Sequence, residues 1–184
     1  ISPIKSLATL PMSISVVGIA IGAIIATRVM SLSGRKYGFI LASIGNTLFS
    51  ILAAYSIYSQ NFILFCFANV FIGIGMAFTH QYRFAAAESV NKEMAPKAIS
   101  IILFGGIISA FLGPSLANFS KDLISENLYV GSYLALALLT FIPSILFLFY
   151  EDKSKFAINL QYKGRSYIEL ISQPRFFQAV CASA

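Results

Sequence analysis

Residues 10–58 read LPMSISVVGIAIGAIIATRVMSLSGRKYGFILASIGNTLFSILAAYSIY. Two apolar runs, 10–30 and 36–58, flank a short connection that contains Gly34, Arg35 and Lys36. A helix needs about 20 mostly apolar residues to cross the hydrocarbon core of a bilayer. Each run therefore predicts one membrane-spanning helix, and the connection predicts a tight turn at the membrane surface.

The same pattern continues along the chain and predicts three further spans, at 61–82, 97–119 and 128–150. Hydrophobic residues make up 58% of the 184 residues and charged residues 11%, whereas soluble domains have about 45–50% and about 25%. A soluble domain of this length buries only part of its apolar surface. We therefore predict an all-α fold, a polytopic transmembrane helical bundle within residues 1–150.

The remaining residues break the apolar pattern. The stretch 151–173 mixes charged residues, a glycine and scattered apolar residues, which is typical of a cytoplasmic linker. The stretch 174–184 is apolar again but too short to cross a bilayer, so it predicts the start of a further transmembrane helix. Since the first residue is Ile1, we expect a chain that is truncated at both ends.

The distribution of basic residues predicts the orientation of the bundle. Cytoplasmic connections of membrane proteins carry an excess of lysine and arginine. Placing the turn at 30–36 in the cytoplasm puts ten of the 13 basic residues on that side and two, Lys5 and Lys121, on the other. We therefore expect a multi-pass protein of the inner or plasma membrane. Topology then explains the net charge of +6, and we expect no nucleic-acid partner. The ten are Arg28, Arg35, Lys36, Lys92, Lys97, Lys153, Lys155, Lys163, Arg165 and Arg175.

Three short patterns resemble motifs of the major facilitator superfamily. Gly34, Arg35 and Lys36 resemble the end of the motif between the second and third helices of that family. In the span 61–82, Asn69, Gly73 and Gly75 keep the spacing of the helix 4 motif RxxxGxG, with asparagine in place of arginine. In the span 97–119, Gly113 and Pro114 resemble the core of the helix 5 motif.

The resemblance covers nearly the whole chain, as helices 2–6, the central cytoplasmic loop and the start of helix 7. It implies the first half of a secondary active transporter, which moves a small solute by alternating access. It also implies several partners: the lipid bilayer, an unidentified small-molecule substrate, a coupling ion such as a proton, and the missing C-terminal half. The alternative is an integral membrane scaffold or channel subunit that does not transport.

Polar residues at membrane depth are costly, and they tend to face a bundle interior or a water-filled path. Asn69 and Asn46 lie near the middle of the spans 61–82 and 36–58, and Ser109 lies within 97–119. The resemblance implies that helix 4 lines the central cavity, which makes Asn69 the preferred substrate contact over Asn46 and Ser109. The competing interpretation is an interhelical hydrogen bond.

A second group of candidates lies near the cytoplasmic end of the span 61–82. His80 and Arg83 are three residues apart and share a helical face, and Glu88 follows. We consider a cytoplasmic gate in which Glu88 pairs with Arg35 or Arg83 in one state and releases it in another, with Lys36 beside it. The alternative is that these side chains only extend to the membrane surface.

The residue pattern argues against an enzyme. The chain has one histidine, His80, and two distant cysteines, Cys66 and Cys181, so neither a metal site nor a catalytic histidine pair is indicated. It contains no GxxxxGK[ST] loop for nucleotide phosphates. We therefore predict no catalytic residues, no metal and no cofactor.

Overall fold

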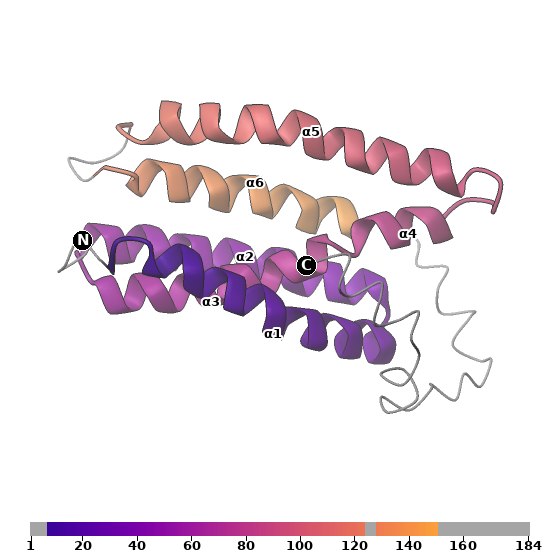
Figure 1. The fold of residues 1–184 in the computed structure, drawn as a ribbon, viewed down its shortest axis with the longest axis horizontal. Coiled ribbons are helices and arrows are strands. Elements are labelled where there is room, and N and C mark those ends of the chain that lie inside the picture. Colours follow the sequence, from indigo (N-terminus) through magenta and orange to yellow (C-terminus); the bar gives the residue numbers. More distant parts are fainter. Residues whose placement is uncertain (1–6, 124–127, 151–184) are drawn as a thin grey trace, which may run out of the picture. The chain divides into compact units, whose positions relative to one another are not determined.

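The computed structural model of the protein describes residues 7–123 and 128–150. This part of the chain has six helices and no strand, and its long helices run side by side (Figure 1). The prediction of an all-helical bundle is therefore confirmed. The predicted linker 151–173 and the predicted helix start 174–184 lie outside the described residues. In chain order the helices are α1 (Leu10–Ser33), α2 (Arg35–Tyr58), α3 (Phe62–Thr79), α4 (Tyr82–Glu88), α5 (Ala95–Ser120) and α6 (Val130–Leu148).

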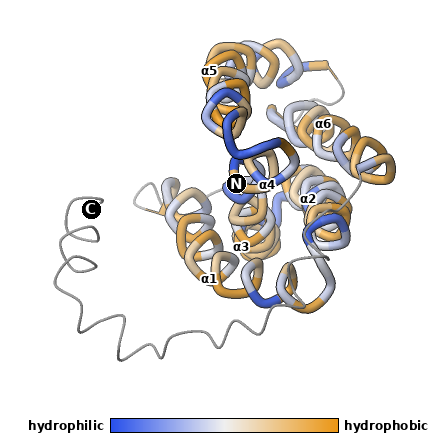
Figure 2. Tube along the Cα trace, turned by 90° about the vertical axis from the view of Figure 1, so that its right-hand side faces the viewer, coloured by the Kyte–Doolittle hydropathy of each residue, from blue (hydrophilic) through white to orange (hydrophobic). Residues whose placement is uncertain are grey.

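Five segments of the described chain are long and apolar enough to cross a membrane, as predicted. Four of them are α1, α2, α5 and α6, and the fifth combines α3 with α4 over Phe62–Glu88. Figure 2 shows hydrophobic residues along the helices and hydrophilic residues mainly at their ends and connections. Helices that are apolar on most sides are suited to a lipid surrounding.

The third span is longer than predicted and has a break. The sequence pattern ends it at residue 82, but a short turn at His80 and Gln81 separates α3 from α4, which continues to Glu88. The amide of Gln81 donates to the Phe78 carbonyl, an i to i−3 bond of 3.0 Å. The helix resumes because YRFAAAE is rich in alanine and other good helix formers. Hydropathy alone therefore placed the end of this helical segment too early.

Helix α1 packs mainly on α3 through glycines. An alanine Cβ at Gly18, Gly22 or Gly73 would lie closer than 3.0 Å to backbone atoms of the opposite helix. Only residues without a side chain allow two backbones to approach this closely, as in other small-residue interfaces between membrane helices. These glycines therefore set the distance between α1 and α3.

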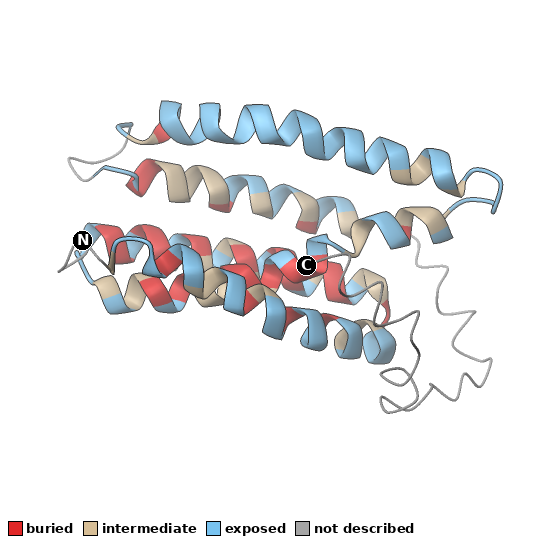
Figure 3. Ribbon diagram, viewed as in Figure 1, coloured by how far each residue is buried: buried red, intermediate tan, exposed pale blue. Residues whose placement is uncertain are grey.

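Helix α2 packs against both α3 and α6, and the buried residues concentrate there (Figure 3). A hydrogen bond of 3.2 Å joins the hydroxyl groups of Thr47 on α2 and Thr140 on α6. The small residues Ala53, Ala54 and Ala68 are almost fully buried. The interior of the bundle thus depends on small side chains and a few polar contacts.

Helix α5 is much less buried than the other long helices. Among its residues only Ser120, the last one, is buried, and Figure 3 shows the rest of the helix as mainly exposed. It packs on α4 and α6. An alanine Cβ at Gly105, Gly106 or Gly113 would meet no atom within 4 Å. Among the described residues, the glycines of α5 therefore do not bring two helix backbones into contact, as those of α1 and α3 do.

Candidate functional site

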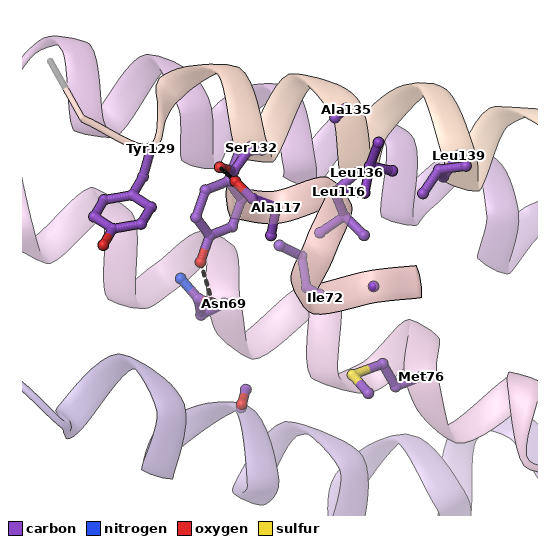
Figure 4. Close-up of a pocket in the computed structure, with 13 residues that line it drawn as sticks. Asn69, Ile72, Met76, Leu116, Ala117, Tyr129, Ser132, Ala135, Leu136 and Leu139 are labelled. Atoms are coloured by element: carbon purple, nitrogen blue, oxygen red, sulfur yellow. Dashed lines mark hydrogen bonds between the residues drawn. The ribbon is translucent and has the colours of Figure 1, made fainter. Parts of the chain in front are cut away.

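A pocket of about 410 Å³ lies among α1, α3, α5 and α6 (Figure 4). This volume falls within the range of about 300–1,000 Å³ that is common for small-molecule sites. Apolar residues of α3, α5 and α6 form much of its wall. The hydrogen-bonding side chains in its lining are Ser15, Asn69, Tyr129, Ser132 and Tyr133. The arrangement suits a solute that is largely apolar and carries a few polar groups.

Asn69 is the polar centre of this pocket, and only 8% of it is exposed. Its Nδ2 donates to the Phe65 carbonyl oxygen one turn earlier, at 2.8 Å. Its Oδ1 accepts a hydrogen bond of 3.4 Å from the Tyr133 hydroxyl on α6 (Figure 4). The rings of Phe65 and Tyr133 meet edge to face, with their centroids 5.4 Å apart. Asn69 therefore lines the pocket and also forms the interhelical bond that was its competing interpretation.

The other two substrate-path candidates lie elsewhere. Asn46 is buried between α2 and α3, against Gly75, and is not among the residues that line this pocket. Ser109 is exposed on α5, and its hydroxyl donates to the Gly105 carbonyl at 2.9 Å. Of the three predicted residues, the structure therefore places only Asn69 in the pocket.

Sequence reasoning missed the contribution of α6 to the pocket. Ser132 and Tyr133 lie in the first turn of this helix and Tyr129 directly precedes it. Ser132 donates to the Ala117 carbonyl of α5 at 2.6 Å. The available signal was the cluster of hydroxyl groups in the first turn of an otherwise apolar span. Such a cluster also occurs at ordinary membrane interfaces, so the signal alone is weak.

The second group of candidates meets at the end of the bundle that holds the α1–α2 turn, the α4–α5 connection and the C-terminus of α6; we call it the basic end. Gly34 makes the turn with φ 87° and ψ 163°, a backbone conformation that favours glycine. Arg35 follows directly, and its Nη2 lies 2.6 Å from Oε1 of Glu88, the last residue of α4. The side chains are 19% and 53% exposed. The predicted partner of Glu88 is thus present, and it is Arg35.

The remaining gate candidates do not join this ion pair. Arg83 lies over the ring of its neighbour Phe84, 5.0 Å from the centroid, and His80 is exposed. Nζ of Lys36 donates to the Leu148 carbonyl oxygen at the end of α6, at 2.7 Å. The structure therefore links the basic residues of the turn to two helices, α4 and α6.

No cluster of three or more histidine, cysteine or acidic residues that could hold a metal ion occurs within residues 7–123 and 128–150. Cys66 lies buried in α3.

Comparison with known proteins now identifies the family. The chain matches the family described as Major Facilitator Superfamily over residues 4–183, which is nearly its full length. The chain belongs to this superfamily. The resemblance to this superfamily is thereby confirmed, and so is the interpretation as a multi-pass membrane protein of this family.

A relative within the superfamily is "Riboflavin transporter RfnT" of Brucella anthropi, which is 30% identical to the chain over 179 residues. The match covers 96% of the chain but 45% of the relative. The chain therefore spans less than half the length of this relative. No solved structure matches the chain.

The structure shows how the superfamily motifs are used in this chain. The two glycines of the pattern that resembles the family's helix 4 motif both lie on α3. Gly73 faces the backbone of α1, and Gly75 faces the Asn46 side chain of α2. Of the helix 5 motif, Gly113 lines the pocket and Pro114 lies inside α5. Of these motif residues, Asn69 and Gly113 line the pocket.

Proposed function

We propose that the chain is part of a secondary active transporter, which moves a small solute across the plasma membrane by alternating access. The observation that carries this proposal is the superfamily match over residues 4–183. Two structural features support it: a pocket that contains hydrogen-bonding groups among four helices, and an ion pair between two helices at the basic end. Alternating access requires a binding site and contacts that can break.

We propose riboflavin as the substrate. The relative that covers 96% of the chain is a riboflavin transporter. A flat heteroaromatic ring system with a hydroxylated chain needs apolar walls, aromatic neighbours and hydrogen-bonding groups, and the pocket supplies all three through Leu136, Tyr133 and Asn69. The chain spans less than half of the relative, so a second half of the same protein would complete the site. The bilayer is the surrounding, and a proton is the proposed coupling ion.

Uptake measured with the complete open reading frame tests this function. Cells that express it are expected to accumulate labelled riboflavin, and unlabelled riboflavin is expected to compete, whereas a sugar or an amino acid is not. A collapse of the membrane proton gradient is expected to lower the uptake rate. If expression adds no riboflavin uptake over the background, the substrate proposal fails. Membership in the superfamily is independent of that result.

Replacing Asn69 with alanine is expected to raise the KM of uptake about tenfold. The change removes an amide that lines the pocket and leaves the Tyr133 hydroxyl without its partner, and losing a buried hydrogen bond costs about 1–3 kcal/mol. The matched control is Asn118→Ala, since Asn118 is exposed on α5. An unchanged KM in Asn69→Ala would remove Asn69 from the substrate path and leave its interhelical bond as its role.

We further propose that the Arg35–Glu88 pair opens during the transport cycle. Glu88→Gln is expected to raise the labelling rate of a cysteine introduced at Ala85, a buried residue of α4, about fivefold in inside-out vesicles. A partly exposed ion pair contributes up to about 1 kcal/mol, which corresponds to this factor. With Glu88 in place, the Nη1 of Arg35 is already buried without a hydrogen-bond partner among the described residues.

The control for this gate is Glu93→Gln, which makes the same charge change in the exposed α4–α5 connection. The labelling rate in this variant is expected to match the parent. The double variant with Arg35→Glu and Glu88→Arg restores a pair of opposite charges. Its labelling rate at position 85 is expected to lie between those of the parent and Glu88→Gln. Equal labelling rates in Glu88→Gln and Glu93→Gln would contradict the gate.

A further inference from the structure

The first two residues of α2 bind the C-terminal ends of two different helices. Arg35 pairs with the carboxylate of Glu88, the last residue of α4. Lys36 donates from Nζ to the carbonyl oxygen of Leu148, the last residue of α6. One turn of chain thus connects three helices at the basic end.

The two contacts differ in their chemistry. The Arg35 contact needs one specific acidic side chain, and Glu88 is 53% exposed, so water can replace it. The Lys36 contact uses a main-chain carbonyl, one of the last four in a helix that have no partner within the helix. These carbonyls carry the negative end of the helix dipole, which favours a cation. The first contact is therefore easily broken, whereas the acceptor of the second is present whatever side chain occupies position 148.

Aromatic packing strengthens the contact between α2 and α6. Phe39 lies three residues after Lys36 and hence on the same face of α2. Its ring lies 5.0 Å from that of Phe147, centroid to centroid, and it is only 1% exposed. Beyond α6, the hydroxyl of Tyr150 is 3.2 Å from that of Ser89, which follows α4. The end of α6 is therefore held to α2 by both polar and apolar contacts. Tyr82 of α4 also packs on the rings of Phe39 and Phe147, so α4 is joined to this end by aromatic contacts as well as by its ion pair with Arg35.

We propose that Lys36 is a positioning residue that keeps the end of α6 fixed to α2 while the Arg35–Glu88 pair opens and closes. The end of α6 leads into the residues that follow Tyr150. A fixed end makes α6 move with α2 as one body. The transport effect rests on the proposed function, but the attachment of α6 to α2 does not.

Transport kinetics of the complete open reading frame test the effect of Lys36 on transport. Lys36→Met is expected to lower the maximal uptake rate per folded transporter at least fivefold with KM changed less than twofold, because the residue lies outside the pocket. Lys36→Arg, which keeps charge and donors, is expected to retain at least half of the parent rate. Lys92→Met is the control, since Lys92 is exposed in the α4–α5 connection and carries the same charge. A parent-like rate in Lys36→Met, or no rescue in Lys36→Arg, would overturn the proposal.

Distances between spin labels test the attachment without any transport assay. Cysteines at Leu41 on α2 and Leu146 on α6 suit this purpose, because these residues are 61% and 63% exposed. The parent is expected to give one narrow distance with and without riboflavin, and Lys36→Met a broad distribution. If Lys36→Met fails to accumulate, Lys36→Ala replaces it, because it removes both the charge and the N–H donors. A narrow, parent-like distance in the uncharged variant would overturn the proposal even if riboflavin proves not to be the substrate.

Discussion

Replacing Gly73 with alanine is expected to destabilise the bundle by about 3 kcal/mol or more, the upper end of the cost of overpacking. The new Cβ would lie closer than 3.0 Å to the carbonyl oxygen of Ser15 on α1. This obstacle is backbone, so no rotation of a side chain can relieve it, and α1 must move away from α3. The gap would also break the packing of Gly18 and Gly22, which face α3 in the same way.

Thermal unfolding of the complete protein in detergent measures this effect. This loss is expected to lower the melting temperature by several degrees. Gly45→Ala is the control, because an alanine Cβ there would meet no atom within 4 Å and alanine favours helix formation. Its melting temperature is expected to equal or exceed that of the parent. A parent-like melting temperature in Gly73→Ala would show that α1 and α3 are farther apart than described.

Much of the fold could be predicted because lipid restricts what a chain can form. Backbone groups in hydrocarbon must bond within their own segment, so a long apolar run indicates a helix. The runs at 10–30 and 36–58 correspond to α1 and α2 for this reason. The apolar pattern placed the end of the third span at residue 82, whereas the helical segment continues through α4 to Glu88. Hydropathy does not show where a helix continues into polar residues such as Arg83 and Glu88.

The site was predicted only in part. The Arg35–Glu88 pair was one of two pairings considered, since charges at the same membrane surface are natural partners, but the sequence did not decide between Arg35 and Arg83. Asn69 stood out because an amide at membrane depth is costly. Tyr133 did not, because a tyrosine near a span boundary is common and its partner is 64 residues away in sequence. Contacts between distant spans depend on helix rotation, which a single apolar pattern does not specify.

Gly75 offers a sharper test of helix rotation, because its obstacle is a side chain rather than backbone. An alanine Cβ at this position would run into the carboxamide of Asn46 on α2. Asn46 is only 6% exposed, and its Oδ1 has no hydrogen-bond partner among the described residues. A buried polar atom without a partner costs about 1–3 kcal/mol. Asn46 therefore fills the space beside Gly75 and contributes little stabilising hydrogen bonding there.

Gly75→Ala alone is expected to destabilise by about 1–3 kcal/mol, and Asn46→Ala alone is expected to change stability by less than about 1 kcal/mol, since lost packing and relieved desolvation offset each other. The double variant is expected to be as stable as Asn46→Ala, because the truncated side chain leaves room for the new Cβ. Melting temperatures of all four proteins give the coupling between the two positions. Gly73→Ala combined with Asn46→Ala is the control and is expected to show no rescue, because its obstacle is the α1 backbone. Additive effects of Gly75→Ala and Asn46→Ala would mean that Asn46 does not face Gly75 and that the rotation of α2 differs from the one described.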